Sequence, residues 1–173
     1  SAGMEQQSAH VKQGAKHKRV PKKLLVLATA GMVVVAIAAA IISYLTASQW
    51  EGEDAVLADT FPHIVSQNSG GEGWQSTSCE HREPSSGELA RIACNSGQFS
   101  VVVAHFESVE ARNAVIPVEG AQTMRSSRCS ALTMPMGSDD SAYGVFPQGD
   151  LAAYGFIVSG DNAEDLRLKL PIC

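Results

Sequence analysis

An uninterrupted apolar run near the start of the chain constrains the fold most. Residues 24–42 read LLVLATAGMVVVAIAAAII, nineteen residues in which Thr29 alone is polar. As an α-helix rising ~1.5 Å per residue, the run is ~28 Å long, close to the ~30 Å hydrocarbon core of a bilayer. Buried helices of soluble domains seldom contain ~18 uncharged apolar residues in a row. The run therefore predicts a transmembrane helix, which we place at residues 24–45.

The charges on the two sides of the apolar run predict its orientation. Residues 1–23 carry six basic side chains and one acidic one, a balance of +5. Residues 24–173 carry seven basic and seventeen acidic side chains, a balance of −10, which brings the whole chain to −5. Short basic flanks stay on the cytoplasmic side of a membrane. We therefore expect a cytoplasmic basic tail at 1–23, a single pass through the plasma membrane, and an extracytoplasmic C-terminal part.

A cleaved signal peptide shares the basic start, so length and the following residues decide between the two interpretations. The apolar region of a signal peptide is ~7–15 residues long and ends at a small-x-small site. This run is longer, and residues 43–48, SYLTAS, match such a site poorly, which favours an uncleaved signal anchor.

The basic tail is expected to set the orientation, with docking to anionic lipids as an alternative. No aromatic residue interleaves with its lysines, so nucleic acid is not an expected partner.

Aromatic and small residues in and beside the apolar run are candidates for interfaces. Tyr44 and Trp50 follow its outer end, where the membrane boundary favours amphipathic rings; chance positions in a linker are the alternative. Gly31, Ala36 and Ala40 are spaced so that a second helix can approach closely. We therefore expect contacts with the lipid bilayer and, through the small residues, with a membrane-protein partner.

The four cysteines all lie in the acidic part, at Cys79, Cys94, Cys129 and Cys173. An even count confined to an exported part predicts two structural disulfides. Three pairings are possible, and we favour the sequence-local one, Cys79 with Cys94 and Cys129 with Cys173. The spacing lacks the close pairs of zinc sites and the C-x-x-C of redox proteins, so no metal or thiol chemistry is expected.

Composition divides the exterior part into a stalk and a domain. Residues 46–73 are expected to form a stalk or linker, with a short helix at 53–61 stopped by Pro62 and a flexible segment at 66–73. Residues 74–173 are expected to form one small domain, which the disulfides help to stabilise. At its end we expect a short helical turn followed by an extended segment.

Short β-branched or aromatic runs bounded by turn residues predict five strands in that domain. They cover residues 89–94, 99–106, 130–134, 142–146 and 151–158. Residues 95–97 predict one hairpin turn, and residues 146–149 predict a second between the last two strands. Ser108 predicts an N-cap for a helix at 109–116. The order predicts an α+β fold with a mostly antiparallel sheet and one or two helices.

Several of these features occur together in a known group of domains. They are Gly73-Trp74 ahead of Cys79, the segment 92–94 running into 99–103, the helical segment 110–112, and a later cysteine pair. With them, residues 74–129 resemble the small extracytoplasmic domains of actinobacterial single-pass membrane proteins, including the exterior domains of transmembrane Ser/Thr kinases. No kinase domain is among these residues, so kinase activity is not implied. The resemblance implies a plasma-membrane protein of a high-GC Gram-positive cell with an exterior binding or interaction domain.

The residue types that carry chemistry form no catalytic pattern. His63, His81 and His105 lack spacings such as H-E-x-x-H, and we expect His105 to pack in a strand and His81 to lie in a solvated loop. No serine has the G-x-S-x-G context of a nucleophile. Asp139 and Asp140 are expected in a solvated turn, not around a calcium ion. We therefore expect no catalytic residue, no cofactor, no metal and no enzymatic activity.

The anchor and the small disulfide-bonded domain predict a protein that works by recognition. We expect an accessory or interaction subunit of a respiratory or envelope-assembly complex, acting through its exterior domain. The alternative is an exterior domain that senses or carries a small ligand, which requires a concave apolar pocket with a few polar groups. Trp74 is a candidate in either case, because it packs over a disulfide or anchors an interface.

Overall fold

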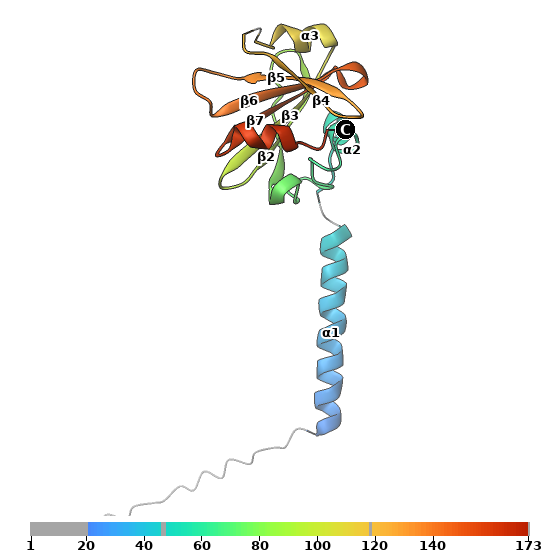
Figure 1. Cartoon of the computed structure of the whole chain (residues 1–173). Helices are drawn as coiled ribbons and strands as arrows, with labels where there is room; N and C mark the ends of the chain where they lie inside the picture. Colours follow the sequence, from blue (N-terminus) through green and yellow to red (C-terminus); the bar gives the residue numbers. More distant parts are fainter. Residues whose placement is uncertain (1–20, 46–47, 118, 173) are drawn as a thin grey trace, which may run out of the picture. The chain divides into compact units, whose positions relative to one another are not determined.

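The computed structural model describes residues 21–45, 48–117 and 119–172 (Figure 1). Residues 1–20 of the predicted basic tail lie outside the described residues, and so does Cys173. The chain divides into two compact units, residues 1–46 and residues 47–173. Each unit is described by itself.

Helix α1 (Lys22–Leu45) makes up the described part of the first unit and matches the helix predicted at residues 24–45. The hydroxyl of Thr29 donates a hydrogen bond to the carbonyl of Val26 at 2.9 Å, so the one polar side chain of the apolar run is satisfied within the helix. All side chains described in α1 are exposed. Among the described residues, no helix has the length and hydropathy that a membrane span requires.

The second unit is built on one seven-stranded antiparallel sheet with strand order β1-β2-β3-β7-β6-β5-β4 (Figure 1). Its strands are β1 (Ser78–Arg82), β2 (Glu88–Asn95), β3 (Phe99–Phe106), β4 (Gln122–Arg125), β5 (Ser130–Pro135), β6 (Ala142–Pro147) and β7 (Tyr154–Gly160). The predicted α+β fold with an antiparallel sheet is confirmed. Two edge strands, β1 and β4, were not predicted, because their sequences SCEHR and QTMR lack the apolar alternation that marks a half-buried strand.

Both predicted hairpins exist, and local turn chemistry accounts for them. The turn predicted at 146–149 begins later than expected, because Phe146 and Pro147 still belong to β6. Between β2 and β3, the Ser96 N–H donates to the Phe99 carbonyl at 2.9 Å, and the Ser96 hydroxyl accepts from the Phe99 N–H at 3.2 Å. Between β6 and β7, Gly149 has a φ of +73°, which glycine adopts without strain, at the start of the 3-10 helix η2 (Gly149–Leu151). Because η2 occupies this turn, β7 begins at Tyr154, three residues later than the predicted strand.

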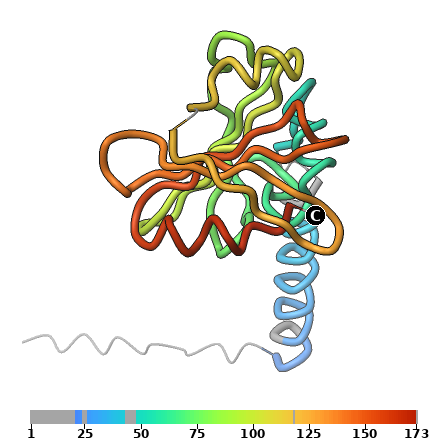
Figure 2. Tube along the Cα trace, turned by 45° about the horizontal axis from the view of Figure 1, so that its top comes forward, coloured from blue at the N-terminus to red at the C-terminus, as the bar shows by residue number. Residues whose placement is uncertain are grey.

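One face of the sheet is covered by helix α2 (Gly52–Thr60) and the segment that follows it. The helix lies against β2 and β3 (Figures 1 and 2). Leu57 is fully buried, and so is Ile64. Phe61 packs edge-on against the ring of Phe156, with centroids 4.9 Å apart. The main core of the domain therefore includes side chains from the segment that precedes the first strand.

The predicted stalk at residues 46–73 is therefore wrong as a separate linker, because the compact unit already begins at Ala47. Its helix at 53–61 exists as α2, but it is a core element. The Gly- and Ser-rich segment predicted to be flexible is tied to β1, because the Gly70 N–H donates to the Cys79 carbonyl at 2.7 Å and the Cys79 N–H donates to Gly71 at 3.1 Å. The composition of this segment predicted a linker. Composition does not reveal the backbone hydrogen bonds that hold the segment against β1.

The C-terminal elements pack on the same core. Helix α4 (Ala163–Leu166) contacts β6 and β7, and η3 (Arg167–Lys169) continues it. The predicted helical turn is confirmed, and residues 170–172 after it form neither a helix nor a strand. The Arg167 guanidinium lies 4.2 Å above the centroid of the Tyr143 ring and donates to the Thr133 hydroxyl at 3.1 Å. These contacts fasten the end of the chain to the sheet.

Helix α3 (Val109–Ala114) connects β3 to β4 and ends two residues before the predicted position. The predicted cap is confirmed, because the Ser108 hydroxyl accepts from the Ala111 N–H at 3.0 Å. Arg112 is 1% exposed and donates to the carbonyls of Pro147 and Tyr154. This arginine holds the short helix against β6 and β7.

The predicted disulfide between Cys79 and Cys94 is confirmed, with an S–S distance of 2.08 Å. The two residues lie directly opposite each other on β1 and β2, and both are fully buried. None of the described cysteines, Cys79, Cys94 and Cys129, is a free thiol. The second predicted pair includes Cys173, which lies outside the described residues.

Candidate functional site

The candidate site lies on the second face of the sheet. Side chains alternate between the faces along each strand, so β3 directs Val101 and Val103 toward the main core and Val102 to the opposite face. Val102 pairs with Ile157 of β7, and both are half-buried. This second face is therefore apolar like the first, although its central strands are only partly covered by other described elements.

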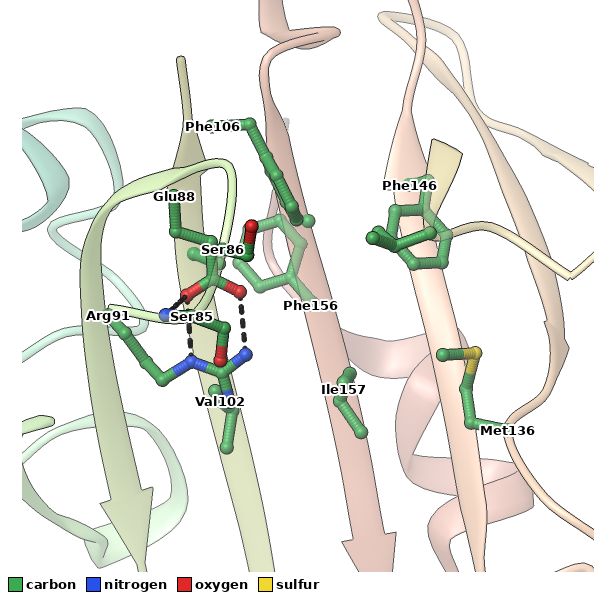
Figure 3. Close-up of a pocket in the computed structure, with 13 residues that line it drawn as sticks. Ser85, Ser86, Glu88, Arg91, Val102, Phe106, Met136, Phe146, Phe156 and Ile157 are labelled. Carbon is green, nitrogen blue, oxygen red and sulfur yellow. Dashed lines mark hydrogen bonds and ion pairs between the residues drawn. The ribbon is translucent and has the colours of Figure 1, made fainter. Parts of the chain in front are cut away.

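An apolar groove of about 150 Å³ opens on this second face (Figure 3). Its apolar walls consist mainly of Val102, Phe106, Val115, Met136, Phe146 and Ile157. These residues come from β3, β6 and β7 and from the segments after α3 and β5. Four polar residues, Ser85, Ser86, Glu88 and Arg91, complete the lining. We call this cavity the groove.

Two glycines allow the ring of Phe146 to lie flat against the sheet beside the groove. A Cβ atom on Gly155 would lie 2.9 Å from Cε1 of Phe146 and 3.2 Å from Cε2 of Phe106. A Cβ atom on Gly144 would lie 2.5 Å from Cε2 of Phe146. No side chain could occupy either position without moving the ring. The shape of the groove therefore depends on two strand positions, in β6 and β7, that carry no side chain.

A partly buried ion pair forms the polar side of the groove. Glu88 has a side chain only 4% exposed, and its two oxygens accept from Nε and Nη2 of Arg91 at 2.8 and 2.6 Å. The backbone N–H of Ser85 donates to Glu88 Oε2 at 3.0 Å. The hydrogen bond with Glu88 raises the pKa of Arg91, and partial burial of the guanidinium works in the opposite direction. Arg91 therefore stays protonated beside the groove.

A second arginine lies behind the same aromatic wall. The guanidinium carbon of Arg112 is 5.9 Å from the centroid of the Phe146 ring. Its nitrogens donate to backbone carbonyls and to the side-chain oxygen of Asn113, at 3.1 and 3.3 Å. Burial lowers the pKa of Arg112, and among the described residues no carboxylate forms an ion pair with it. Around the groove, the described side chains thus include two guanidinium groups and one carboxylate.

The histidines do not contribute to the groove. His81 lies in β1, which corrects the prediction of a solvated loop, and its Nδ1 is 2.6 Å from Asp54 Oδ2 of α2. His105 lies in β3, as predicted, with its Nδ1 3.3 Å from Glu53 Oε2. His63 is exposed. In the described ranges no cluster of three histidine, cysteine or acidic residues could hold a metal ion.

Two of the predicted interface residues, Trp74 and Trp50, lie in the second unit and do not line the groove. Trp74 is half-buried, packs on the main core and meets Phe99 edge-on at 5.9 Å. Trp50 also packs on that core, and its indole N–H donates to the Ser66 carbonyl at 2.8 Å. This contact places Trp50 in the folded domain; a position at the membrane boundary stays a prediction.

The small residues of α1 line an exposed surface of that helix. Gly31 and Ala36 contribute to one shallow apolar depression, together with Ala28, Met32, Val35 and Ala39. Ala40 is exposed as well. The side chain of Tyr44 lies outside the described residues. No described contact tests the predicted role of these residues in helix association.

The groove residues were not singled out by the sequence analysis. Two signals in the sequence point to them. Side chains along β3 and β7 alternate between two apolar faces, and glycines lie within two apolar strands, where glycine often marks the close approach of another group. Which apolar residues remain uncovered depends on where α2 and α3 pack.

Comparison of the chain with protein-family models, with curated proteins and with solved structures finds no match. The resemblance to actinobacterial exterior domains therefore stays a prediction.

Proposed function

We propose that this chain is a non-enzymatic, single-pass protein of the plasma membrane whose extracytoplasmic domain binds a small apolar group in the groove. The observation that carries the proposal is the open apolar groove of about 150 Å³ on the second face of the sheet. Ligand sites are concave and mostly apolar, with a few polar groups that orient the ligand. The groove has both properties.

The size of the groove limits what it can hold. A dry apolar cavity of about 150 Å³ accommodates a benzene ring, whereas sites for larger ligands have volumes of roughly 300–1,000 Å³. A single ring or a branched aliphatic group therefore fits inside, and the rest of a larger ligand would stay outside. A ligand that covers the half-buried side chains of Val102 and Ile157 would gain about 25 cal/mol of binding free energy per Å² of apolar surface removed from water.

The anchoring part of the proposal rests on α1 and on the disulfide. The nineteen-residue uncharged run belongs to a 24-residue helix whose described side chains are all exposed. A bilayer would cover this apolar surface while the helix satisfies its own backbone groups. Lys22 and Lys23 at the start of the helix favour a cytoplasmic N-terminal side. The disulfide between Cys79 and Cys94 supports an oxidising compartment for the domain.

A groove-filling variant tests the binding function. The full-length protein is purified from its native membrane, and native mass spectrometry measures small molecules retained by the wild type and by Val102→Trp. We expect a retained molecule that is lost in Val102→Trp, because the indole occupies the groove. The matched control is Val56→Trp, which places the same ring on an exposed site of α2, 39% accessible in the wild type. Retention by both variants, or by no form of the protein, would contradict the proposal.

A second candidate function is that of an accessory subunit of a respiratory or envelope-assembly complex. The observation that favours it is the shallow apolar depression on α1, in which Gly31 and Ala36 leave room for another helix. Among the described residues, nothing would lie within 4 Å of a Cβ atom on Gly31. The position is therefore open to a second helix.

Copurification tests this second candidate. Gentle solubilisation from the native membrane is expected to yield a stoichiometric membrane-protein partner. Gly31→Leu is expected to release that partner, because its side chain fills the depression, whereas Val34→Leu elsewhere on the helix keeps it. Purification of a clean monomer at native expression would count against the accessory role and leave the ligand-binding role standing.

A further inference from the structure

We infer that the groove takes a small carboxylic acid with an aromatic or branched-aliphatic body, bound as its carboxylate. The body occupies the apolar part of the groove, and the carboxylate lies at the polar rim beside Arg91. This inference rests on the proposed binding function and names the ligand class of the same site.

Unused hydrogen-bond donors are collected on one side of the groove. Figure 3 shows Ser85 and Ser86 beside the pair of Glu88 and Arg91, across the groove from Phe146 and Met136. Arg91 donates to Glu88 through Nε and Nη2 alone, which leaves Nη1 without an acceptor among the described residues. The exposed hydroxyls of Ser85 and Ser86 likewise make no hydrogen bond to any described group. Three donors thus border an apolar cavity on one side.

The balance of charge selects an anion for this rim. Both oxygens of Glu88 are engaged, by Arg91 and by the Ser85 N–H, so this carboxylate has little attraction left for a ligand cation. The Arg112 guanidinium adds a positive charge behind the Phe146 ring, and within the described residues no carboxylate neutralises it. An ammonium group at the rim would lie beside the positive charge of Arg91. A carboxylate would receive charge-assisted hydrogen bonds, which are stronger than neutral ones.

The apolar walls select the body of the ligand. Phe106 and Phe146 offer aromatic surfaces on which a ring can pack edge-on or offset, and the paired residues Val102 and Ile157 add aliphatic surface. A long acyl chain would exceed the volume of about 150 Å³. A short acid such as acetate would leave the apolar part empty. A ring or branched group of roughly six carbon atoms, comparable to benzene, satisfies both limits.

Equilibrium dialysis with the full-length protein in lipid nanodiscs tests the inference, with empty nanodiscs as the blank. The probes are phenylacetate, phenylacetamide, phenethylamine and acetate, which vary the head group and the body separately. We expect phenylacetate to bind at least tenfold more tightly than phenylacetamide, and we expect no detectable binding of phenethylamine or acetate. Val102→Trp should abolish phenylacetate binding.

Variants of the ion pair separate the role of charge from that of folding. Arg91→Gln alone leaves Glu88 buried without its partner, so the double variant Glu88→Gln/Arg91→Gln replaces the ion pair with two neutral amides. We expect the double variant to bind phenylacetate and phenylacetamide equally, at the wild-type affinity for the amide. Arg128→Gln removes an exposed arginine outside the groove and should retain the wild-type preference for the acid.

The outcomes distinguish this inference from the binding function on which it rests. Equal binding of phenylacetate and phenylacetamide to the wild type, abolished by Val102→Trp, would overturn the carboxylate preference and leave an apolar binding site. Tighter binding of phenethylamine would overturn the assigned charge. Failure of every probe, or binding unaffected by Val102→Trp, would overturn the groove as a binding site altogether.

Discussion

At the scale of single residues, the groove depends on two positions without a side chain. Gly144 and Gly155 lie on adjacent strands, and Phe146 packs over the backbone of both. Neither glycine has a positive φ, so their role is to leave space for the ring. This requirement separates them from turn glycines such as Gly149, whose φ of +73° demands glycine for conformational reasons.

We expect Gly155→Ala to destabilise the domain and to narrow the groove. The new methyl group would lie 2.9 Å from Phe146, and overpacking of this kind costs typically 1–3 kcal/mol. Urea unfolding measures the loss, and dialysis of phenylacetate measures the change in the groove. Gly97→Ala is the matched control, because a Cβ atom there meets nothing within 4 Å. Equal stability of the Gly155→Ala variant and the wild type would contradict the packing described here.

Tyr143 makes stability sensitive to alkaline pH. Burial raises its pKa above the ordinary 10.0, the carboxylates of Asp140 and Glu164 raise it further, and Arg167 opposes them. The folded state thus favours the neutral phenol. This contribution is complete below the unfolded pKa and is lost as pH rises through the folded pKa. As pH rises above 10.0 we therefore expect Tyr143→Phe to lose less stability than the wild type in urea unfolding.

The control for this pH dependence is Tyr154→Phe. It retains Tyr143 and should lose stability with pH as the wild type does. Parallel stability curves for Tyr143→Phe and the wild type across this range would show that Tyr143 is not responsible for the loss.

At the scale of elements, two short helices are fastened to the sheet by a few polar contacts. Helix α2 carries Glu53 and Asp54 at its start, and these contact His105 of β3 and His81 of β1. Helix α3 has six residues, so its own hydrogen bonds cannot hold it in water. The N-cap residue Ser108 and the hydrogen bonds of Arg112 stabilise this short helix instead.

Ser108→Ala should therefore loosen α3. Loss of an N-cap acceptor costs about 1 kcal/mol of stability. Here it also loosens the helix directly before Val115, which lines the groove. We expect faster hydrogen exchange at the Ala111 amide and lower affinity for phenylacetate. Ser108→Asp, which retains an acceptor, should show the wild-type exchange rate at Ala111 and the wild-type affinity for phenylacetate. Unchanged exchange in Ser108→Ala would mean that tertiary contacts alone hold the helix.

At the scale of the whole molecule, the folded unit begins far ahead of its first strand. Residues from 47 onward belong to it, and four of its core side chains precede β1, namely Leu57, Phe61, Ile64 and Val65. Without them, the face of the sheet that carries Phe156 and Val158 would be open to water. The segment between α1 and β1 is therefore part of the domain core.

Two truncations test this boundary. We expect residues 47–173 to fold cooperatively, and we expect residues 74–173 to remain unfolded because α2 and its four core side chains are missing. Circular dichroism and urea unfolding measure the difference, with the disulfide between Cys79 and Cys94 intact in both. A cooperative transition in the shorter form would restore the stalk interpretation.

Much of the fold was predictable because its signals are local. The apolar run located α1, the β-branched segments located five of the seven strands, and Ser108 located the start of α3. The groove was not predictable in the same way. Val102 and Val103 are identical in type and adjacent in sequence, but one lines the groove and the other is fully buried in the main core. Only the packing of α2 on one face of the sheet distinguishes them.

The sequence alone determined the helix at 24–45, the α+β class and the antiparallel hairpins, and it favoured the pairing of Cys79 with Cys94. Each of these follows from residues close together in the chain, whose periodicity or turn chemistry acts over a few positions. The tertiary structure alone decided that residues 47–73 belong to the core, that His81 meets Asp54, and that a groove remains beside Phe146. These depend on which surfaces meet after the chain has folded, and contacts between distant residues leave no periodic signal in a single sequence.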